Sequence, residues 1–474
     1  MTKKMFQISR IIAILATVFI GVGLLSDEKV YLLDGDMKMR CVWQSVCVVY
    51  FLLISHLYEK KIKIFSVGYL FIFINVFIIG TLGPFFFTNS RLLADAVGGA
   101  RMPKDHYDLY MVIYFSVMTI ILVYLLLQKH TTEEIKREDF LNVQSKDDTA
   151  VLLSSVLLVL PAMLVLGETG LLFGVPILCY FFLRIMDSKF TFQMNVICYI
   201  GLLIGMYGLY RVRYNRYLVV EYIVPIAFAF CTYVAVNDSK KKGKIVVPLL
   251  FAGIFAVLAY GIVSEMVKLN MYWGRSYNIW DELTDFTSVI DFVERQVFRL
   301  FGVWTELGGN IIEHVQINGF YHGLTYIKSL APYFGFEYVN LPQISAKYIV
   351  ATYAQPGIIA EGYANFGIIG SIGNVLVPFF MIEFLLRYFL KKRDAFSICL
   401  MSCCFVKLMI DGGTINNIIF AMAVCVLVFS AYLFFRWIGT YVVGLEKLKL
   451  HIVEKKKYVC EEDYGEDIDH CTGI

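Results

Sequence analysis

The chain has 474 residues, of which 58% are hydrophobic and only 17% are charged, with a net charge of +3. Its mean hydropathy of +0.67 excludes a water-soluble domain of this length, whose surface cannot carry so much apolar area. The small net charge, scattered between apolar runs, also argues against a nucleic-acid partner. We therefore predict an all-α polytopic membrane protein.

Apolar runs long enough to cross about 30 Å of hydrocarbon recur along the chain. Hydropathy predicts about twelve spans, near residues 8–25, 39–58, 62–87, 107–127, 149–166, 170–186, 190–210, 217–236, 245–264, 366–390, 395–411 and 415–436. These runs divide the chain into four parts: helices one to nine in 1–263, a large polar loop in 264–365, helices ten to twelve in 366–436, and a charged tail in 437–474.

Lys and Arg residues gather in alternate loops, for example at 60–63, 240–244 and 387–393. Positive charge stays on the cytoplasmic side during insertion, so this distribution puts both termini in the cytoplasm and the 264–365 loop outside. Most of the eleven cysteines lie within apolar spans, and none has metal-ligand spacing. We therefore expect neither a metal site nor a disulfide framework.

Cationic residues also occur where insertion disfavours them. Arg211, Arg213 and Arg216 lie together in the outer turn after the seventh span, and guanidinium forks match the oxygens of a lipid diphosphate. Alternatively they anchor the turn at the headgroups beside neighbouring tyrosines. Lys407 and Asp411 are four residues apart near the outer end of the eleventh span. They are either a neutralised pair or part of the site, because ionisable groups in spans usually face a functional cavity.

Within the outer loop, residues 281–304 have apolar side chains at helical spacing, which predicts an amphipathic helix at the interface. The loop also holds His314 and His322, which lie among glycines and aromatic residues. A histidine titrates near neutrality, so His322 is a candidate to accept a hydroxyl proton. The alternative is that it is an incidental loop residue.

The loop closes with the segment 353–370, YAQPGIIAEGYANFGIIG. Pro356 and Gly357 break the chain, and a short helix over 358–366 then puts Glu361 and Asn365 on one face. The glycines that follow allow the next span to pack closely. Glu361 is our best candidate for an acid-base or acceptor-orienting residue, and Asn365 can hold an acceptor sugar by hydrogen bonds. The alternative is that Glu361 neutralises an outer arginine and holds the loop.

The same segment resembles the Wzy-type oligosaccharide repeat-unit polymerases of bacterial surface polysaccharide pathways. The resemblance rests on its proline, its glutamate and Tyr-x-Asn-Phe-Gly-x-x-Gly, here Pro356, Glu361, Tyr363, Asn365, Phe366, Gly367 and Gly370. The number of spans, the outer arginines and the large outer loop late in the sequence are also similar to those of this family. This architecture further resembles that of the GT-C-like polymerases and ligases.

The resemblance implies transfer of a growing glycan from undecaprenyl diphosphate to a lipid-linked repeat unit, at the outer face of the bacterial cytoplasmic (inner) membrane. It implies no cofactor or metal, and a flippase and a chain-length regulator as partners in the pathway. The arginines and Lys407 would hold the diphosphate. Glu361, His322 or Asp411 would take the proton of the acceptor hydroxyl, and Tyr363 and Asn365 would contact the acceptor.

Two other classes of protein fit parts of this pattern. An O-antigen ligase uses the same lipid donor and differs in its acceptor. A flippase or other transporter also has many spans, but it needs no large outer loop, and inverted repeats are not apparent in the sequence.

The charge distribution makes a prediction about topology. A cysteine introduced by Trp304→Cys should react with a membrane-impermeant thiol reagent in cells whose outer envelope has been opened. A cysteine introduced by Lys241→Cys should not react. The unsubstituted protein gives the background from the native cysteines. Protection at position 304 would overturn the topology.

A second prediction concerns the three outer arginines. Replacing Arg211, Arg213 or Arg216 with Lys keeps the charge but removes the planar fork, and should reduce polymer formation at normal protein abundance. Chain-length distributions on gels measure the effect. Wild-type distributions in all three variants would exclude the diphosphate site.

Overall fold

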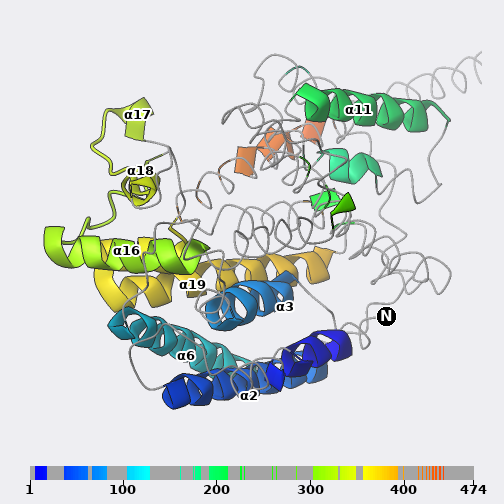
Figure 1. Ribbon diagram of the computed structural model, residues 1–474. Helices are drawn as coiled ribbons and strands as arrows, with labels where there is room; N and C mark the ends of the chain where they lie inside the picture. Colours follow the sequence, from blue (N-terminus) through cyan, green and yellow to red (C-terminus); the bar gives the residue numbers. More distant parts are fainter. Residues whose placement is uncertain are drawn as a thin grey trace, which may run out of the picture.

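The computed structural model describes residues 6–15, 17–18, 37–61, 67–82, 104–128, 177–182, 192–211, 303–328, 331–347 and 356–392, with single residues and pairs elsewhere. Within these residues all regular structure is helical, which confirms the predicted all-α class (Figure 1). The predicted helix over 281–304 lies almost wholly outside the described residues. The described helix in this part of the chain begins at its end, at Val303.

The described helices include α2 (Met37–Lys61), α3 (Val67–Phe71), the wider π-helix η1 (Ile72–Leu82), α6 (Lys104–Leu127), α11 (Phe192–Arg211), α16 (Val303–Asn318), α17 (Ala331–Phe334), α18 (Leu341–Ala346) and α19 (Ile358–Lys392). A further helix covers Phe6–Leu15. These elements overlap the spans predicted near 8–25, 39–58, 62–87, 107–127, 190–210 and 366–390. The sequence did not predict α16, α17 or α18.

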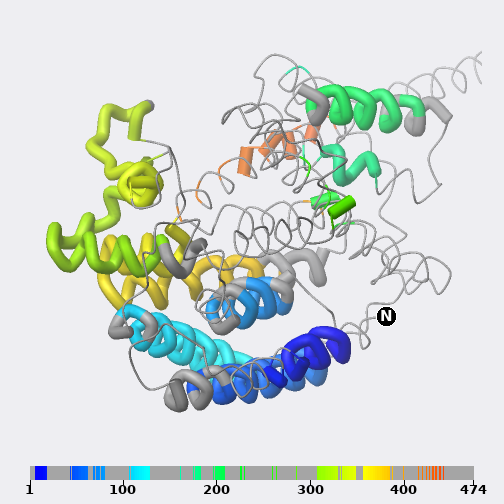
Figure 2. The backbone as a smooth tube through the Cα atoms, in the orientation of Figure 1, coloured from blue at the N-terminus to red at the C-terminus, as the bar shows by residue number. Residues whose placement is uncertain are grey.

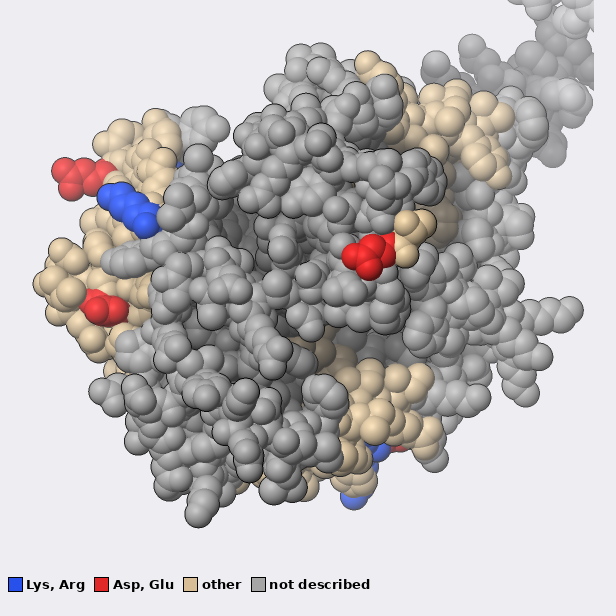
Figure 3. Space-filling model, viewed as in Figure 1, with Lys and Arg blue, Asp and Glu red and all other residues tan. Residues whose placement is uncertain are grey.

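Two helical stretches, Asp108–Leu127 of α6 and Ile358–Phe384 of α19, are long and apolar enough to cross a membrane. Large apolar side chains are exposed on α6, α11 and α19, among them Leu126, Leu203 and Phe384. On the face shown in Figure 3, few of the described residues are charged. An apolar exterior of this kind is compatible with a membrane protein.

Ring and hydrogen-bond contacts fix the directions of the packed helices. Helices α2 and α6 are parallel, because Tyr50 packs on Phe115 at 4.9 Å and Lys61 Nζ donates to the carbonyl of Leu125 at 2.6 Å. The long part of α19, after Gly367, runs the same way. Its Arg387 donates to Tyr124 Oη at 2.5 Å near the C-terminal end of α6, whereas Tyr110, near the N-terminal end of α6, meets Ala360 at Gly308. The bundle therefore has one end near Lys104 and the break at Gly367 and another near Lys61 and Arg387.

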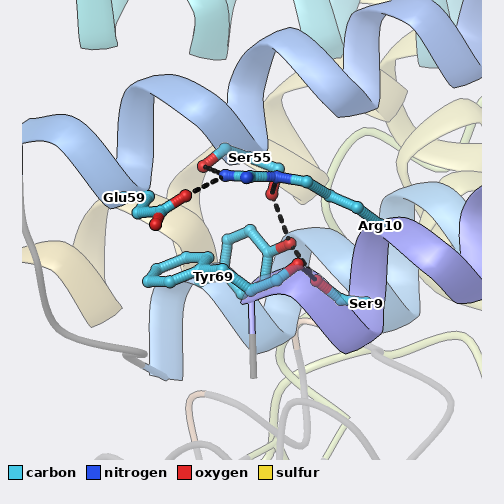
Figure 4. A network of polar contacts seen from close by, with 6 residues as sticks. Ser9, Arg10, Ser55, Glu59 and Tyr69 are labelled. Atoms are coloured by element: carbon cyan, nitrogen blue, oxygen red, sulfur yellow. Dashed lines mark hydrogen bonds and ion pairs between the residues drawn. The ribbon is translucent and has the colours of Figure 1, made fainter. Parts of the chain in front are cut away.

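A polar network joins the helix Phe6–Leu15 to α2 and α3 at the second of these ends (Figure 4). Arg10 pairs with Glu59 at 2.6 Å and donates to Ser55 Oγ at 2.8 Å. The Tyr69 hydroxyl donates to Ser55 at 2.8 Å and lies 2.5 Å from Ser9 Oγ. The partly exposed ion pair therefore continues inward as a chain of paired hydroxyls.

Helix α19 is a hairpin followed by a long helix. Helical geometry breaks at Phe366 (φ −142°, ψ 22°) and Gly367 (φ 63°, ψ −146°), where the left-handed φ favours glycine. The segment before the break folds back along the segment after it, so that Ser371 Oγ donates to the Ile359 carbonyl at 2.9 Å. Asn374 Nδ2 donates to the Ile358 carbonyl at 3.1 Å. We call residues 358–374 the hairpin.

The two arms of the hairpin approach each other at glycines. A Cβ on Gly362 would overlap the backbone of Gly370 and Ser371. The sequence predicts a short helix over 358–366 and close packing at the glycines that follow, but it does not predict the break at Phe366 and Gly367 or the turn-back of the chain there. Helix α16 packs along α19 (Figure 2).

The glycine contact predicts a stability difference. Gly362→Ala should lower the free energy of unfolding by about 1–3 kcal/mol, because the added methyl group meets backbone atoms that cannot rotate away. Gly373→Ala is the matched control, since its methyl group would meet no atom within 4 Å. Thermal unfolding of the purified protein in detergent measures both variants. Equal melting temperatures would contradict the close approach.

Candidate functional site

The loop that follows α16 lies on the hairpin and is held there by backbone amides. The N–H of Tyr321 donates to the Ala364 carbonyl at 2.8 Å, and the N–H of Gly323 donates to Asn365 Oδ1 at 2.8 Å. Gly319, His322 and Gly323 have positive φ angles, which turn the chain sharply over the hairpin. Residues 319–328 therefore cover the face of the hairpin that carries Asn365.

Glu361 is buried beneath this loop, with 2% of its surface exposed. Thr325 Oγ1 donates to its Oε1 at 3.4 Å, and the backbone N–H of Ile415 donates to its Oε2. Asn365 Nδ2 donates to Thr325 Oγ1 at 2.6 Å and to the Glu361 carbonyl at 2.8 Å. A buried carboxylate needs such donors, because an unpaired buried charge is costly.

The contact with Ile415 brings a third chain segment to the site. Ile415 lies four residues after Asp411 in the sequence, so the structure joins Glu361 to a part of the chain far from the hairpin in sequence. The predicted site residues Arg213, Arg216, Lys407 and Asp411 lie outside the described residues. Arg211 is the last residue of α11, and only its backbone is described.

Tyr326 adds a hydrogen-bond donor to the same cluster. Its hydroxyl donates to Asn374 Oδ1 at 2.7 Å. Burial and, to a smaller extent, the nearby Glu361 charge raise the pKa of Tyr326 to about 12, against the lowering effect of hydrogen bonds with Asn374 and Asn365. The phenol therefore stays protonated at neutral pH and acts as a donor.

Asn365 and Tyr363, predicted to contact the acceptor, are engaged within the protein. The amide group of Asn365 is fully buried and holds both the loop and the hairpin. Tyr363 packs against a cluster of buried apolar residues and meets the Phe320 ring at 6.0 Å between centroids. In this conformation both residues fix the position of Glu361, and their contact with an acceptor remains a prediction.

The two loop histidines differ in their surroundings. His322 is exposed, and among the described contacts none joins it to Glu361. His314 Nε2 lies 2.9 Å from the Tyr321 hydroxyl, which ties α16 to the loop. Among the described residues, no group of three or more His, Cys, Asp or Glu side chains can hold a metal ion.

Sequence reasoning missed Thr325, Tyr326 and Asn374 as members of this cluster. A signal existed for Asn374, because a polar side chain within an apolar span usually faces a partner inside the bundle. Thr325 and Tyr326 lie in a loop with many polar and aromatic residues, and nothing in the pattern distinguishes them. The backbone donor of Ile415 has no signature in the sequence.

In the part of the chain that the structure describes, the fold and this site define a helical protein with two membrane-compatible helices and a buried carboxylate beneath a loop. The family described as "Family of unknown function (DUF6032)" matches residues 1–468, and the chain belongs to it. No curated protein and no solved structure matches the chain.

Proposed function

We propose that this protein is a membrane-embedded glycosyltransferase that polymerises undecaprenyl-diphosphate-linked oligosaccharide repeat units. The observation that carries the proposal is the buried Glu361, held between a loop residue, Thr325, and the amide of Ile415. A carboxylate in a site shielded from water can take the proton of an acceptor hydroxyl. The hairpin and its covering loop supply such a site.

The proposal includes about twelve spans, cytoplasmic termini, and a site at the outer face of the bacterial inner membrane. The parallel packing of α6 and α19 supports this topology. Two parallel spans need an odd number of crossings between them, and about five are predicted there. The predicted outer end of α6, near Lys104, also lies at the same end of the bundle as the hairpin, because Tyr110 of α6 and Ala360 of the hairpin meet at Gly308.

The reaction needs cations that stabilise the charge on the leaving diphosphate, and a base that takes the proton of the acceptor hydroxyl. The acceptor hydroxyl oxygen forms a bond to the anomeric carbon of the donor, the bond from this carbon to the diphosphate oxygen breaks, and undecaprenyl diphosphate leaves. Arg211, Arg213, Arg216 and Lys407 would stabilise the charge on the leaving diphosphate. Neither a nucleotide sugar nor a metal is required, because the donor is already activated.

Glu361 would take the proton of the acceptor hydroxyl. Its contact with Thr325 is long, at 3.4 Å, and is therefore the one that an acceptor hydroxyl most easily replaces. Asn365 and Thr325 would keep the carboxylate oriented during the reaction. A flippase would deliver the lipid-linked repeat units to the outer face, and a chain-length regulator of the same pathway would act on the growing polymer.

Substitution of Glu361 tests the proposal. As the base, Glu361→Gln should still bind the lipid-linked donor but should accumulate a single repeat unit on the lipid, with polymer reduced by at least about a hundredfold. The exposed Glu313→Gln on α16 is the matched control. Lipid-linked glycans extracted from cells and resolved by mass show the result.

Two outcomes separate the alternatives. Long polymer from Glu361→Gln at nearly the wild-type rate, together with a lowered melting temperature in Glu361→Ala, would make Glu361 a structural brace and not the base. Deletion of the gene distinguishes a polymerase from a ligase. Accumulation of single repeat units on the lipid in the deletion strain supports a polymerase. Long polymer left on undecaprenyl diphosphate would indicate a ligase instead.

A further inference from the structure

Two polar side chains near the N-terminal end of α6 are buried without a partner. His106 is 6% exposed and Tyr110 is 3% exposed. Within the described part of the chain, neither His106 Nδ1 nor the Tyr110 hydroxyl has a hydrogen-bond partner. The two residues are four apart, so they share one face of the helix. Unpaired buried polar groups cost stability, and their retention calls for an explanation.

This face of α6 meets α16 and the hairpin at Gly308 and Ala360. A Cβ on Gly308 of α16 would overlap the Tyr110 hydroxyl and would lie 3.5 Å from Ala360 Cβ. The hydroxyl therefore reaches the junction of α16 with the residue that precedes Glu361. Gly308 leaves room for this hydroxyl, which any larger residue at position 308 would displace.

We propose that His106 and Tyr110 form a subsite that binds a hydroxyl or acetamido group of the acceptor sugar, next to Glu361. This inference rests on the proposed function. The imidazole Nδ1 donates or accepts a hydrogen bond according to its tautomer, and a phenol hydroxyl does both. Such a pair matches a neutral sugar group, whereas a diphosphate requires cations.

The subsite gives the unpaired groups a function and predicts opposite effects on stability and binding. Removal of an unpaired buried hydroxyl eliminates its desolvation cost, so Tyr110→Phe should raise the melting temperature by about 1–2 °C. The same change removes a hydrogen bond to the ligand, so binding should weaken by about tenfold. A hydroxyl with a structural partner would show the opposite stability effect.

The experiment uses the purified full-length protein in detergent and, as the probe, the total lipid extract of the producing cells. The protein is incubated with the extract and washed, and the sugar-bearing lipid that it retains is measured by mass spectrometry. Tyr110→Phe and His106→Phe should retain about tenfold less than the wild type, and His106→Asn should recover part of the loss by restoring a polar atom near Nδ1. Tyr114→Phe, one turn further along the same face, is the control and should match the wild type.

Each result has one meaning. Wild-type retention by Tyr110→Phe would overturn the subsite and leave the proposed function intact. A lower melting temperature in Tyr110→Phe would also overturn it, because the hydroxyl would then be paired in the resting protein, for example by a buried water. If the wild-type protein itself retains no sugar-bearing lipid, the proposed function fails and the subsite fails with it.

Discussion

The close approach of Gly362 to Gly370 determines where the buried carboxylate lies. It allows residues 358–365 to lie against the start of the long helix, and this places Glu361 inside the bundle instead of on a surface loop. The Ile358 carbonyl accepts a hydrogen bond from Asn374, and the Ile359 carbonyl accepts one from Ser371. Because backbone groups away from water must be paired, these two side chains make the turn-back tolerable at this depth.

The surroundings of Glu361 follow from the cost of burying its charge. Its donors come from separate parts of the chain, Thr325 in the loop after α16 and Ile415 beyond the long helix. Asn365 links the Thr325 hydroxyl to the backbone of Glu361, so the loop cannot move without disturbing the carboxylate. This coupling makes the covering loop part of the site. The raised pKa of Tyr326 reports the same environment, since burial and the carboxylate both disfavour a phenolate.

The sequence predicts the local events of this fold better than the contacts between its parts. Pro356 and Gly357 predict a break followed by a short helix, and the helix begins at Ile358 as expected, whereas the second break at Phe366 and Gly367 was not predicted. They do not predict that the short helix folds back, because this depends on Gly362 meeting Gly370 across the break. Apolar runs likewise predict the helices but not their neighbours. In the sequence Tyr110 is not distinguished from the other aromatic residues of its span. Only its contact with Gly308 shows that it lies beside the hairpin.

Polar groups occur at both ends of the bundle, and their partners differ. At the end near Lys61, charged groups have partners: Arg10 pairs with Glu59, Tyr58 with Glu383, and Lys61 with the last carbonyls of α6, while Gln128 Oε1 is buried there without a partner among the described residues. Such pairing fixes the helices to one another, as expected where only packing is required. At the end near the hairpin, His106 Nδ1 and the Tyr110 hydroxyl are buried without partners among the described residues. Buried groups without partners are costly for the folded state, and a ligand that pairs with them removes this cost.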